Sequence, residues 1–250
     1  MRCFGLIGYP LSHSFSKKYF TEKFEREGIH DCTYENFPLE KVSLLPGLVA
    51  SQPVLAGLNV TIPYKETVIP YLHSVDEVAA SIGAVNTVRI TRSGSELHLR
   101  GYNTDAFGFR SSIVPYILGD FKRALVLGTG GASRAVAYIL HELGMEVTFV
   151  SRKPAGAERI SYASLTPLLI SQVNVIVNTS PVGMYPSGGE CPDIPYHSLT
   201  SRHVVYDLVY NPPETLFLAN AGKMGAVTVN GLQMLHLQAE KSWEIWNSPI

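Results

Sequence analysis

The stretch from Arg123 to Lys153 constrains the fold of this 250-residue chain more than any other. A short apolar run at 124–127 is followed at once by the glycine-rich turn 128–131, and then by apolar residues at helical spacing up to Gly144. A second β-rich run occupies 146–150. Strand, glycine turn, helix and strand in this order predict a βαβ unit of the dinucleotide-binding kind.

The glycine turn suits an anion, because glycines let the backbone approach a pyrophosphate and a helix N-terminus points free N–H groups at it. The turn departs from the strict G-x-G-x-x-G spacing: Ser133 or Arg134 stands where the third glycine is expected. A glycine turn can also be a plain link between strand and helix, but the two flanking strands favour nucleotide binding. The predicted contacts are Gly128, Thr129, Gly130, Gly131 and Ala132.

The end of the second strand indicates which nucleotide is bound. An NAD site has Asp or Glu about 20 residues after the glycine turn, where it binds the ribose 2′-hydroxyl. Here the sequence reads Ser151, Arg152 and Lys153. Two cations suit a 2′-phosphate, so NADP is predicted in preference to NAD; the alternative is a solvated basic turn.

Composition excludes several classes of protein. A net charge of −1 gives no reason to expect a nucleic-acid or membrane partner. Cys3, Cys32 and Cys191 are scattered without a C-x-x-C pair, so neither a disulfide framework nor a metal site is expected. The N-terminus has no signal pattern and no apolar run approaches the ~20 residues of a membrane span. A cytoplasmic protein is therefore expected.

Strands and helices alternate along the rest of the chain, which predicts an α/β fold with a parallel sheet. Strands are predicted at 3–8, 33–37, 55–60, 173–177, 204–208 and 226–229, helices at 15–26, 39–49, 75–82, 105–118 and 232–246, and a hairpin pairs 86–90 with 97–99. The first hundred or so residues thus form one α/β domain, ahead of the nucleotide unit.

Polar residues cluster at two strand ends of this first domain. Ser12, His13, Ser14 and Ser16 follow the first strand, where small hydroxyls either cap the next helix or donate to a carboxylate. Asn59, Thr61 and Lys65 stand at the end of the strand 55–60 and just after it, and could line a ligand site outside its carboxyl end. A lone lysine is more often simply solvated.

Two further polar residues stand among small or apolar neighbours. Asn86 lies within Gly-Ala-Val-Asn-Thr, either as a turn residue or as a group that reaches ligand hydroxyls. Asp105 follows Asn103 and Thr104, where it could be no more than the N-cap of a helix.

Taken together and in this order, the motifs resemble the shikimate/quinate dehydrogenase family. The resemblance covers nearly the whole chain. It is carried by Ser14-Phe15-Ser16, V-T-x-P-x-K ending at Lys65, Gly-Ala-Val-Asn86-Thr, Asn-Thr-Asp105, the glycine turn, Asn178 to Met184, Asp207 to Pro212, and Asn230-Gly231-Leu232 leading to Gln238.

The resemblance implies two domains with a cleft between them: a substrate-binding catalytic domain, 1–104, completed by a C-terminal helix at 232–250, and a Rossmann domain for NADP, 105–231. It implies reversible reduction of 3-dehydroshikimate to shikimate, on the route to chorismate and aromatic amino acids. Lys65 and Asp105 become the catalytic pair. The implied substrate contacts are Ser14, Ser16 and Tyr210 at the carboxylate, and Asn59, Thr61, Lys65, Asn86, Asp105 and Gln238 around the ring.

Further cofactor contacts are also implied by the family pattern: Glu77, Thr179, Ser180, Leu208, Gly231 and Met234, besides the glycine turn and Ser151 to Lys153. The chain departs from that pattern at three positions. Ala106 replaces a usual glycine, Thr129 a common alanine, and Ser151 a frequent asparagine, which would weaken contacts to the adenosine ribose.

Ketone reduction needs a hydride on carbon, which the cofactor supplies, and a proton on oxygen, which a nearby cation such as Lys65 can supply. Two alternatives remain open: a quinate/shikimate dehydrogenase of broader specificity, and a catalytically silent NADP-binding sensor. Retention of both Lys65 and Asp105 argues against the sensor. Either a monomer or a homodimer is compatible with the sequence.

Overall fold

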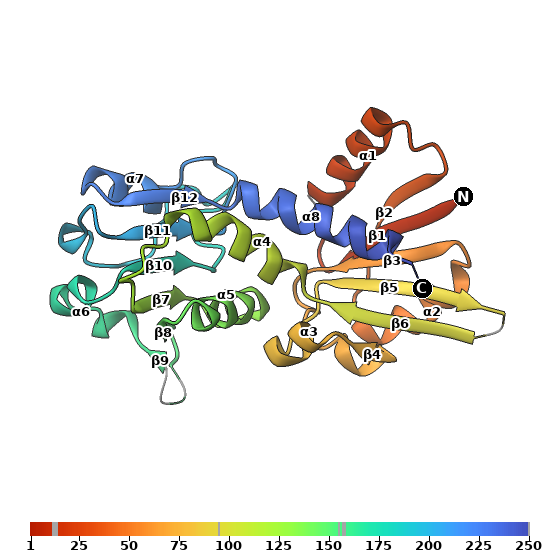
Figure 1. Cartoon of the computed structure of the whole chain (residues 1–250), viewed down its shortest axis with the longest axis horizontal. Helices are drawn as coiled ribbons and strands as arrows, with labels where there is room; N and C mark the ends of the chain where they lie inside the picture. Colours follow the sequence, from red (N-terminus) through yellow and green to blue (C-terminus); the bar gives the residue numbers. More distant parts are fainter. Residues whose placement is uncertain (12–14, 95, 155, 157–158, 250) are drawn as a thin grey trace. The chain divides into compact units, whose positions relative to one another are not determined.

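A computed structural model describes residues 1–11, 15–94, 96–154, 156 and 159–249 (Figure 1). The chain divides into two compact units: Met1–Thr104 with Ala239–Ile250, and Asp105–Gln238. The division falls inside the last helix, α8 (Leu232–Asn247), so that its first part groups with the second unit. The predicted first domain includes the whole of this helix; what each unit binds remains a prediction.

The first unit contains a six-stranded mixed sheet in the order β2-β1-β3-β5-β6-β4. β1 runs parallel to both of its neighbours, β2 and β3, whereas β5 runs antiparallel to both β3 and β6. The hairpin predicted from 86–90 and 97–99 is present, with Ile90 opposite Leu99, but its pairing extends further, from Thr87 opposite Tyr102 to Ser93 opposite Glu96. The strands are β1 (Arg2–Gly8), β2 (Cys32–Pro38), β3 (Leu55–Val60), β4 (Ser74–Val75), β5 (Thr87–Ser93) and β6 (Glu96–Tyr102).

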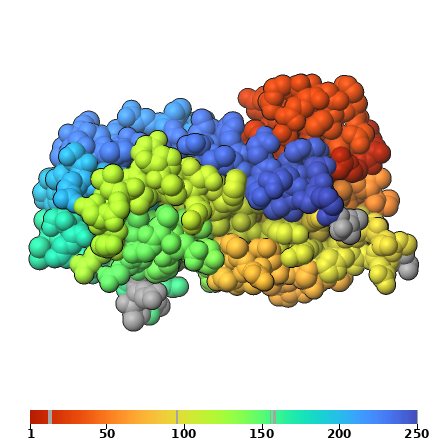
Figure 2. All heavy atoms as spheres, in the orientation of Figure 1, coloured from red at the N-terminus to blue at the C-terminus, as the bar shows by residue number. Residues whose placement is uncertain are grey.

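Helices cover both faces of this sheet because successive side chains of a strand point to opposite sides. Phe4 and Leu6 of β1 pack in one core with α1 (Phe15–Glu27) and the end of α8. Cys3 and Ile7 pack in the other core with α2 (Leu45–Ser51) and α3 (Glu77–Ile82). Figure 2 shows the outer side of α1, in red, at the molecular surface.

The second unit contains a fully parallel sheet, as the sequence predicted. Its strand order, β12-β11-β10-β7-β8-β9, is the doubly wound order of Rossmann domains, in which the strand order reverses between β7 and β10. The strands are β7 (Arg123–Leu127), β8 (Glu146–Val150), β9 (Arg159–Ile160), β10 (Val175–Asn178), β11 (Val204–Asp207) and β12 (Val227–Asn230).

Four helices flank this second sheet: α4 (Thr104–Ile113), α5 (Gly131–Glu142), α6 (Pro167–Ser171) and α7 (Leu216–Lys223) (Figure 1). Ile170 of α6 and Phe217 of α7 share a core with Leu125, Leu127 and Val205 of the sheet. Phe109 of α4 contacts the ring of Tyr206, at 5.2 Å between centroids. Both faces are thus covered, which explains why β10 and β11 are buried along their whole length.

Three predicted helices are longer than the observed ones at one end, and for two of them the local reason is visible. The helix expected at 105–118 ends at Ile113, and Pro115 lies in a 3₁₀ turn beyond it, since proline lacks the N–H that a helix interior needs. The helix expected from 39 begins only at Leu45. The helix expected from 75 begins at Glu77, because Asp76 caps it by accepting from Val78 N at 2.9 Å.

Among the residues whose placement is described, no helix is both long and apolar enough to cross a membrane.

Candidate functional site

One edge of the first sheet gathers most of the predicted substrate residues of that unit. The parallel strands β1 and β3 end at this edge; β5, antiparallel to β3, begins there, and β6 ends there. Thr61 and Lys65 after β3 therefore lie near Asn86 before β5 and Thr104 after β6. Two backbone bonds fix this: Val85 N donates to Lys65 O at 2.7 Å, and Val60 N donates to Asn86 O at 2.8 Å.

The turn that carries Lys65 is anchored by its neighbour Tyr64. Tyr64 is buried in the core, and its hydroxyl donates to Leu39 O. Lys65 itself is half-buried. The turn thus has a fixed base, while the Lys65 side chain is not fully buried.

The side chains of Asn59 and Asn86 are only 5% and 3% exposed. Tyr34 OH donates to Asn59 Oδ1 at 2.7 Å, and Asn59 Nδ2 donates to Ser242 Oγ at 3.0 Å. Asn86 Oδ1 accepts from Thr104 N at 2.7 Å. Both amides are therefore held in one orientation by protein groups, which sequence reasoning did not foresee.

Other predicted residues of the first unit are placed as follows. Ser14 lies outside the described residues, together with Ser12 and His13. Ser16 is half-buried in the first turn of α1 and hydrogen-bonds the Tyr34 hydroxyl, whose pKa is raised by burial although this bond opposes the rise. Thr61 is half-buried and its N–H donates to Ile7 O at 2.9 Å. Glu77 is exposed in the first turn of α3, just after β4.

In the second unit the glycine turn lies at the point where the strand order reverses. Gly128 has a φ of +126°, and a Cβ there would lie 2.5 Å from Thr179 Oγ1, so only glycine fits. Thr179 in turn donates to Leu127 O through both its N–H, at 3.0 Å, and its hydroxyl, at 2.9 Å. The loops after β7 and β10, both predicted to bind the cofactor, are therefore joined directly.

The remainder of the turn runs into α5. Gly130 is the N-cap residue in an extended conformation, and the helix begins at Gly131. Ser133, at the position of the missing third glycine, is fully buried and its hydroxyl bonds Gly130 O. Ser133 is therefore a small buried residue at the position where the usual pattern has glycine. Thr129 and Ala132, in the same turn, are half-buried.

The end of β8 fits a phosphorylated ribose. Arg152 and Lys153 are exposed, and Ser151 is half-buried, with its hydroxyl accepting from Lys153 N at 3.3 Å. Ser151 N also donates to Ile160 O at 2.9 Å, which fixes the start of the turn. A close backbone approach at Gly128 and two cations after β8 are what a dinucleotide with a 2′-phosphate needs.

A buried carboxylate that sequence reasoning missed supports the loop after β10. Asp207 is fully buried and accepts from Asn178 Nδ2 at 2.9 Å, from Val209 N at 3.0 Å and from Thr215 Oγ1 at 2.6 Å. Asn178 Oδ1 in turn accepts from the hydroxyl of Ser180 at 2.7 Å. The signal was present in the sequence, since Asn178 and Asp207 are polar residues that end buried strands.

Burial raises the pKa of Asp207 to about 6, against the opposing effect of its hydrogen bonds to Thr215, Val209 and Asn178. Because the pKa of Asp207 is higher in the folded state than in the unfolded state, the contribution of this group to the free energy of unfolding is largest below about pH 4. That contribution is lost as the pH rises through about 6 and the buried carboxyl becomes charged.

The isosteric variant Asp207→Asn has no charge to bury. From pH 4 to 7 we expect the free energy of unfolding of the parent to fall by up to about 3 kcal/mol relative to Asp207→Asn.

Urea unfolding of both proteins across this pH range measures the difference. Asp193→Asn, at an exposed carboxyl in the same unit, is the control and should follow the parent. Curves for the parent and Asp207→Asn that stay parallel throughout would contradict a raised pKa.

Two more pairs of predicted residues are neighbours in the second unit. A Cβ on Gly231 would overlap Leu208 O, so the backbones after β11 and β12 touch at these predicted cofactor contacts. Gly108 of α4 approaches α8 so closely that a Cβ would lie 2.6 Å from Met234 O and 3.2 Å from Gln238 Cβ. Asp105, one turn before Gly108, therefore lies on a helix packed against the one that carries Gln238 and Met234.

Tyr210 follows β11 and is half-buried, and burial raises the pKa of its hydroxyl.

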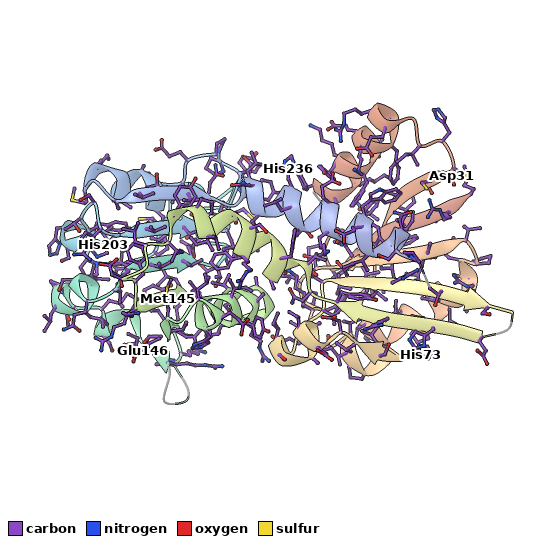
Figure 3. The ribbon with its side chains drawn as sticks, viewed as in Figure 1. Asp31, His73, Met145, Glu146, His203 and His236 are labelled. Carbon is purple, nitrogen blue, oxygen red and sulfur yellow. The ribbon has the colours of Figure 1, made fainter. Side chains whose placement is uncertain are left out.

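His203, labelled in Figure 3, lies at the opposite edge of the second sheet from the predicted site residues. It precedes β11, at the amino ends of the strands, and is 3% exposed. One ring nitrogen accepts from Thr200 N at 3.0 Å and the other lies 3.0 Å from Ile170 O. This buried histidine is structural, whereas the predicted site residues of the sheet follow the carboxyl ends.

Comparison with known proteins agrees with this arrangement. A family model described as the shikimate dehydrogenase substrate binding domain matches residues 6–88. A shikimate dehydrogenase (NADP(+)) of Methanococcus maripaludis strain C6 is 40% identical, over 97% of this chain and 90% of its own.

Two solved structures are similar over the whole chain. Shikimate dehydrogenase 1 from Peptoclostridium difficile is 38% identical with a TM-score of 0.84, covering 100% of this chain and 93% of its own. Shikimate 5-dehydrogenase from Thermus thermophilus, solved in complex with NADP(H) and shikimate, is 31% identical with a TM-score of 0.85, covering 100% and 95%. The resemblance seen in the motifs is thus confirmed, and the chain belongs to the shikimate dehydrogenase family.

Proposed function

We propose that this protein is an NADP-dependent shikimate dehydrogenase that reversibly reduces 3-dehydroshikimate to shikimate, a step toward chorismate and the aromatic amino acids. The observation that carries the proposal is the edge of the first sheet, where the turn of Lys65 is bonded to the strand connection that holds Asn86. Membership of the family supports the same reaction, since relatives bear this name and one was solved with shikimate and NADP(H).

In this proposal the first unit binds the substrate and the second binds the cofactor. Lys65 gives a proton to the carbonyl oxygen during reduction and takes it back during oxidation, while Asp105 orients a ring hydroxyl and the lysine. The other substrate contacts are the set predicted from sequence: Ser14, Ser16, Asn59, Thr61, Asn86, Tyr210 and Gln238.

NADP, when bound, supplies the hydride. On the protein side, the proposal assigns the pyrophosphate to the glycine turn from Gly128 to Ala132 and the 2′-phosphate to Arg152 and Lys153. Thr179, Ser180, Leu208, Gly231 and Met234 complete the site, with Glu77 of the first unit. The close approach at Gly128 and the exposed cations after β8 support this assignment.

The test is the rate of NADPH formation with shikimate or quinate as the substrate. We expect kcat/KM for shikimate to exceed that for quinate by about 100-fold, because simple pockets reject an added hydroxyl on this scale. Comparable values would indicate the broader quinate/shikimate class. Binding of NADP without turnover of either acid would indicate the silent sensor.

We further propose that the protein works in the cytoplasm as a monomer or homodimer, with no nucleic-acid partner. The three free cysteines, Cys3, Cys32 and Cys191, support a reducing compartment.

A further inference from the structure

A cluster of buried hydroxyl and amide groups lies inside the first unit, behind the edge that carries Lys65. At its centre is Thr87, whose side chain is fully buried at the start of β5. Thr87 Oγ1 lies 2.7 Å from Ser242 Oγ and 3.2 Å from Thr104 Oγ1. It also lies 3.3 Å from Asn59 Nδ2. One hydroxyl thus contacts polar groups from β3, the start of α4 and the end of α8.

The cluster extends in two directions to residues with proposed substrate roles. On one side Asn59 is held between Ser242 Oγ and the Tyr34 hydroxyl, which also bonds Ser16. On the other side Asn86 Nδ2 donates to Thr104 Oγ1 at 3.0 Å. The hydrogen bonds therefore connect Ser16, Asn59 and Asn86 through groups that are themselves out of reach of solvent.

These bonds decide which way each amide points. Because Tyr34 OH donates to Asn59 Oδ1, the NH₂ group of Asn59 must face Ser242 and Thr87. Likewise Thr104 N donates to Asn86 Oδ1, so the NH₂ group of Asn86 faces the Thr104 hydroxyl. A buried network strengthens when all its members are paired, and loss of the Thr87 hydroxyl removes one hydrogen bond each from Ser242, Thr104 and Asn59.

We infer that Thr87, together with Ser242 of the C-terminal helix, is a positioning residue that holds Asn59 and Asn86 in the orientation required for substrate. The inference rests on the proposed function, because it takes the substrate to be shikimate. It adds two residues that touch no reacting atom and act through the amides. The hydroxyl of Thr87 is the essential group, and its methyl group is dispensable.

The test compares Thr87→Val, which keeps the shape but removes the hydroxyl, with Thr87→Ser, which keeps the hydroxyl. We expect Thr87→Val to raise KM for shikimate about tenfold, the scale of a lost buried hydrogen bond, with KM for NADP unchanged. Thr87→Ser should restore KM for shikimate to within about threefold of the parent. A folded Thr87→Val with parental KM, or equal changes in both KM values, would overturn the inference.

Ser242→Ala gives the same readouts should Thr87→Val fail to fold, since alanine suits a helix and adds no volume. An independent readout is the pair of side-chain amide NMR signals of Asn59 and Asn86. They should shift and exchange faster in Thr87→Val, or in Ser242→Ala, and return in Thr87→Ser, whether or not the parent turns over shikimate. Inactivity of the parent would therefore refute the proposed function alone, whereas unchanged amide signals would refute the positioning role.

Discussion

Lys65→Ala is expected to lower kcat for shikimate oxidation at least ~100-fold, the usual effect of removing a general acid or base. The reason is that oxidation would lose the base that takes the proton from the hydroxyl, and reduction would lose the donor that protonates the alkoxide oxygen. Lys65 is only half-buried, and its turn is anchored by Tyr64 and by the bond from Val85 N to Lys65 O, so the variant should keep its fold. Stopped-flow absorbance of NADPH measures the rate of the chemical step directly.

Two controls distinguish a loss of proton transfer from a general effect of removing a lysine and from weaker cofactor binding. Lys41→Ala removes an exposed lysine of the same unit and should keep the parental kcat. NADP affinity of Lys65→Ala, measured by fluorescence titration, should also remain close to that of the parent, since the cofactor is assigned to the second unit. Near-normal turnover by Lys65→Ala would remove this residue from the catalytic role.

Arg152→Ala is expected to raise KM for NADP roughly 10- to 100-fold while KM for NAD changes little. A charge-assisted hydrogen bond to the 2′-phosphate contributes ~1.5–3 kcal/mol to NADP binding. NAD has no 2′-phosphate, so the substitution removes no such bond from it. Arg152 is exposed directly after β8, a position at which an NAD site has an acid. The measurement is a pair of initial-rate series, one for each cofactor, at saturating shikimate.

Arg110→Ala, at an exposed arginine of α4 in the same unit, is the matched control and should leave both KM values unchanged. Equal increases for NADP and NAD in Arg152→Ala would mean that the arginine contacts a part that the two cofactors share, and the 2′-phosphate assignment would be wrong.

The two sheets differ in how far they could be predicted. The bounds of β3 and β8 agree with the sequence prediction at both ends, because an apolar run bounded by turn residues is a local signal. The parallel second sheet also followed from alternation of strands and helices. The two-residue strands β4 and β9 were missed, since so short a segment has no periodicity of its own.

The residues of the candidate site could also be predicted from the sequence, but not their side-chain contacts. Its polar residues were found because each interrupts a small or apolar stretch, as Asn86 does, or follows a strand, as Lys65 does. The sequence could not show what their side chains contact. Asn59 was expected to bind substrate, yet its amide is held by Tyr34, Thr87 and Ser242, and its direct contact with substrate stays a prediction.

The sequence by itself determined the βαβ unit, its glycine turn and the basic end of β8, because these depend on residues within one local stretch. Only the tertiary structure decided that Thr87 meets Ser242 across 155 positions, and that Asp207 supports Asn178 and Thr215. The physical reason is that a buried hydroxyl or carboxylate must find partners wherever the folded chain brings them. Nothing in the local sequence around Thr87 or Asp207 specifies which distant residues those partners are.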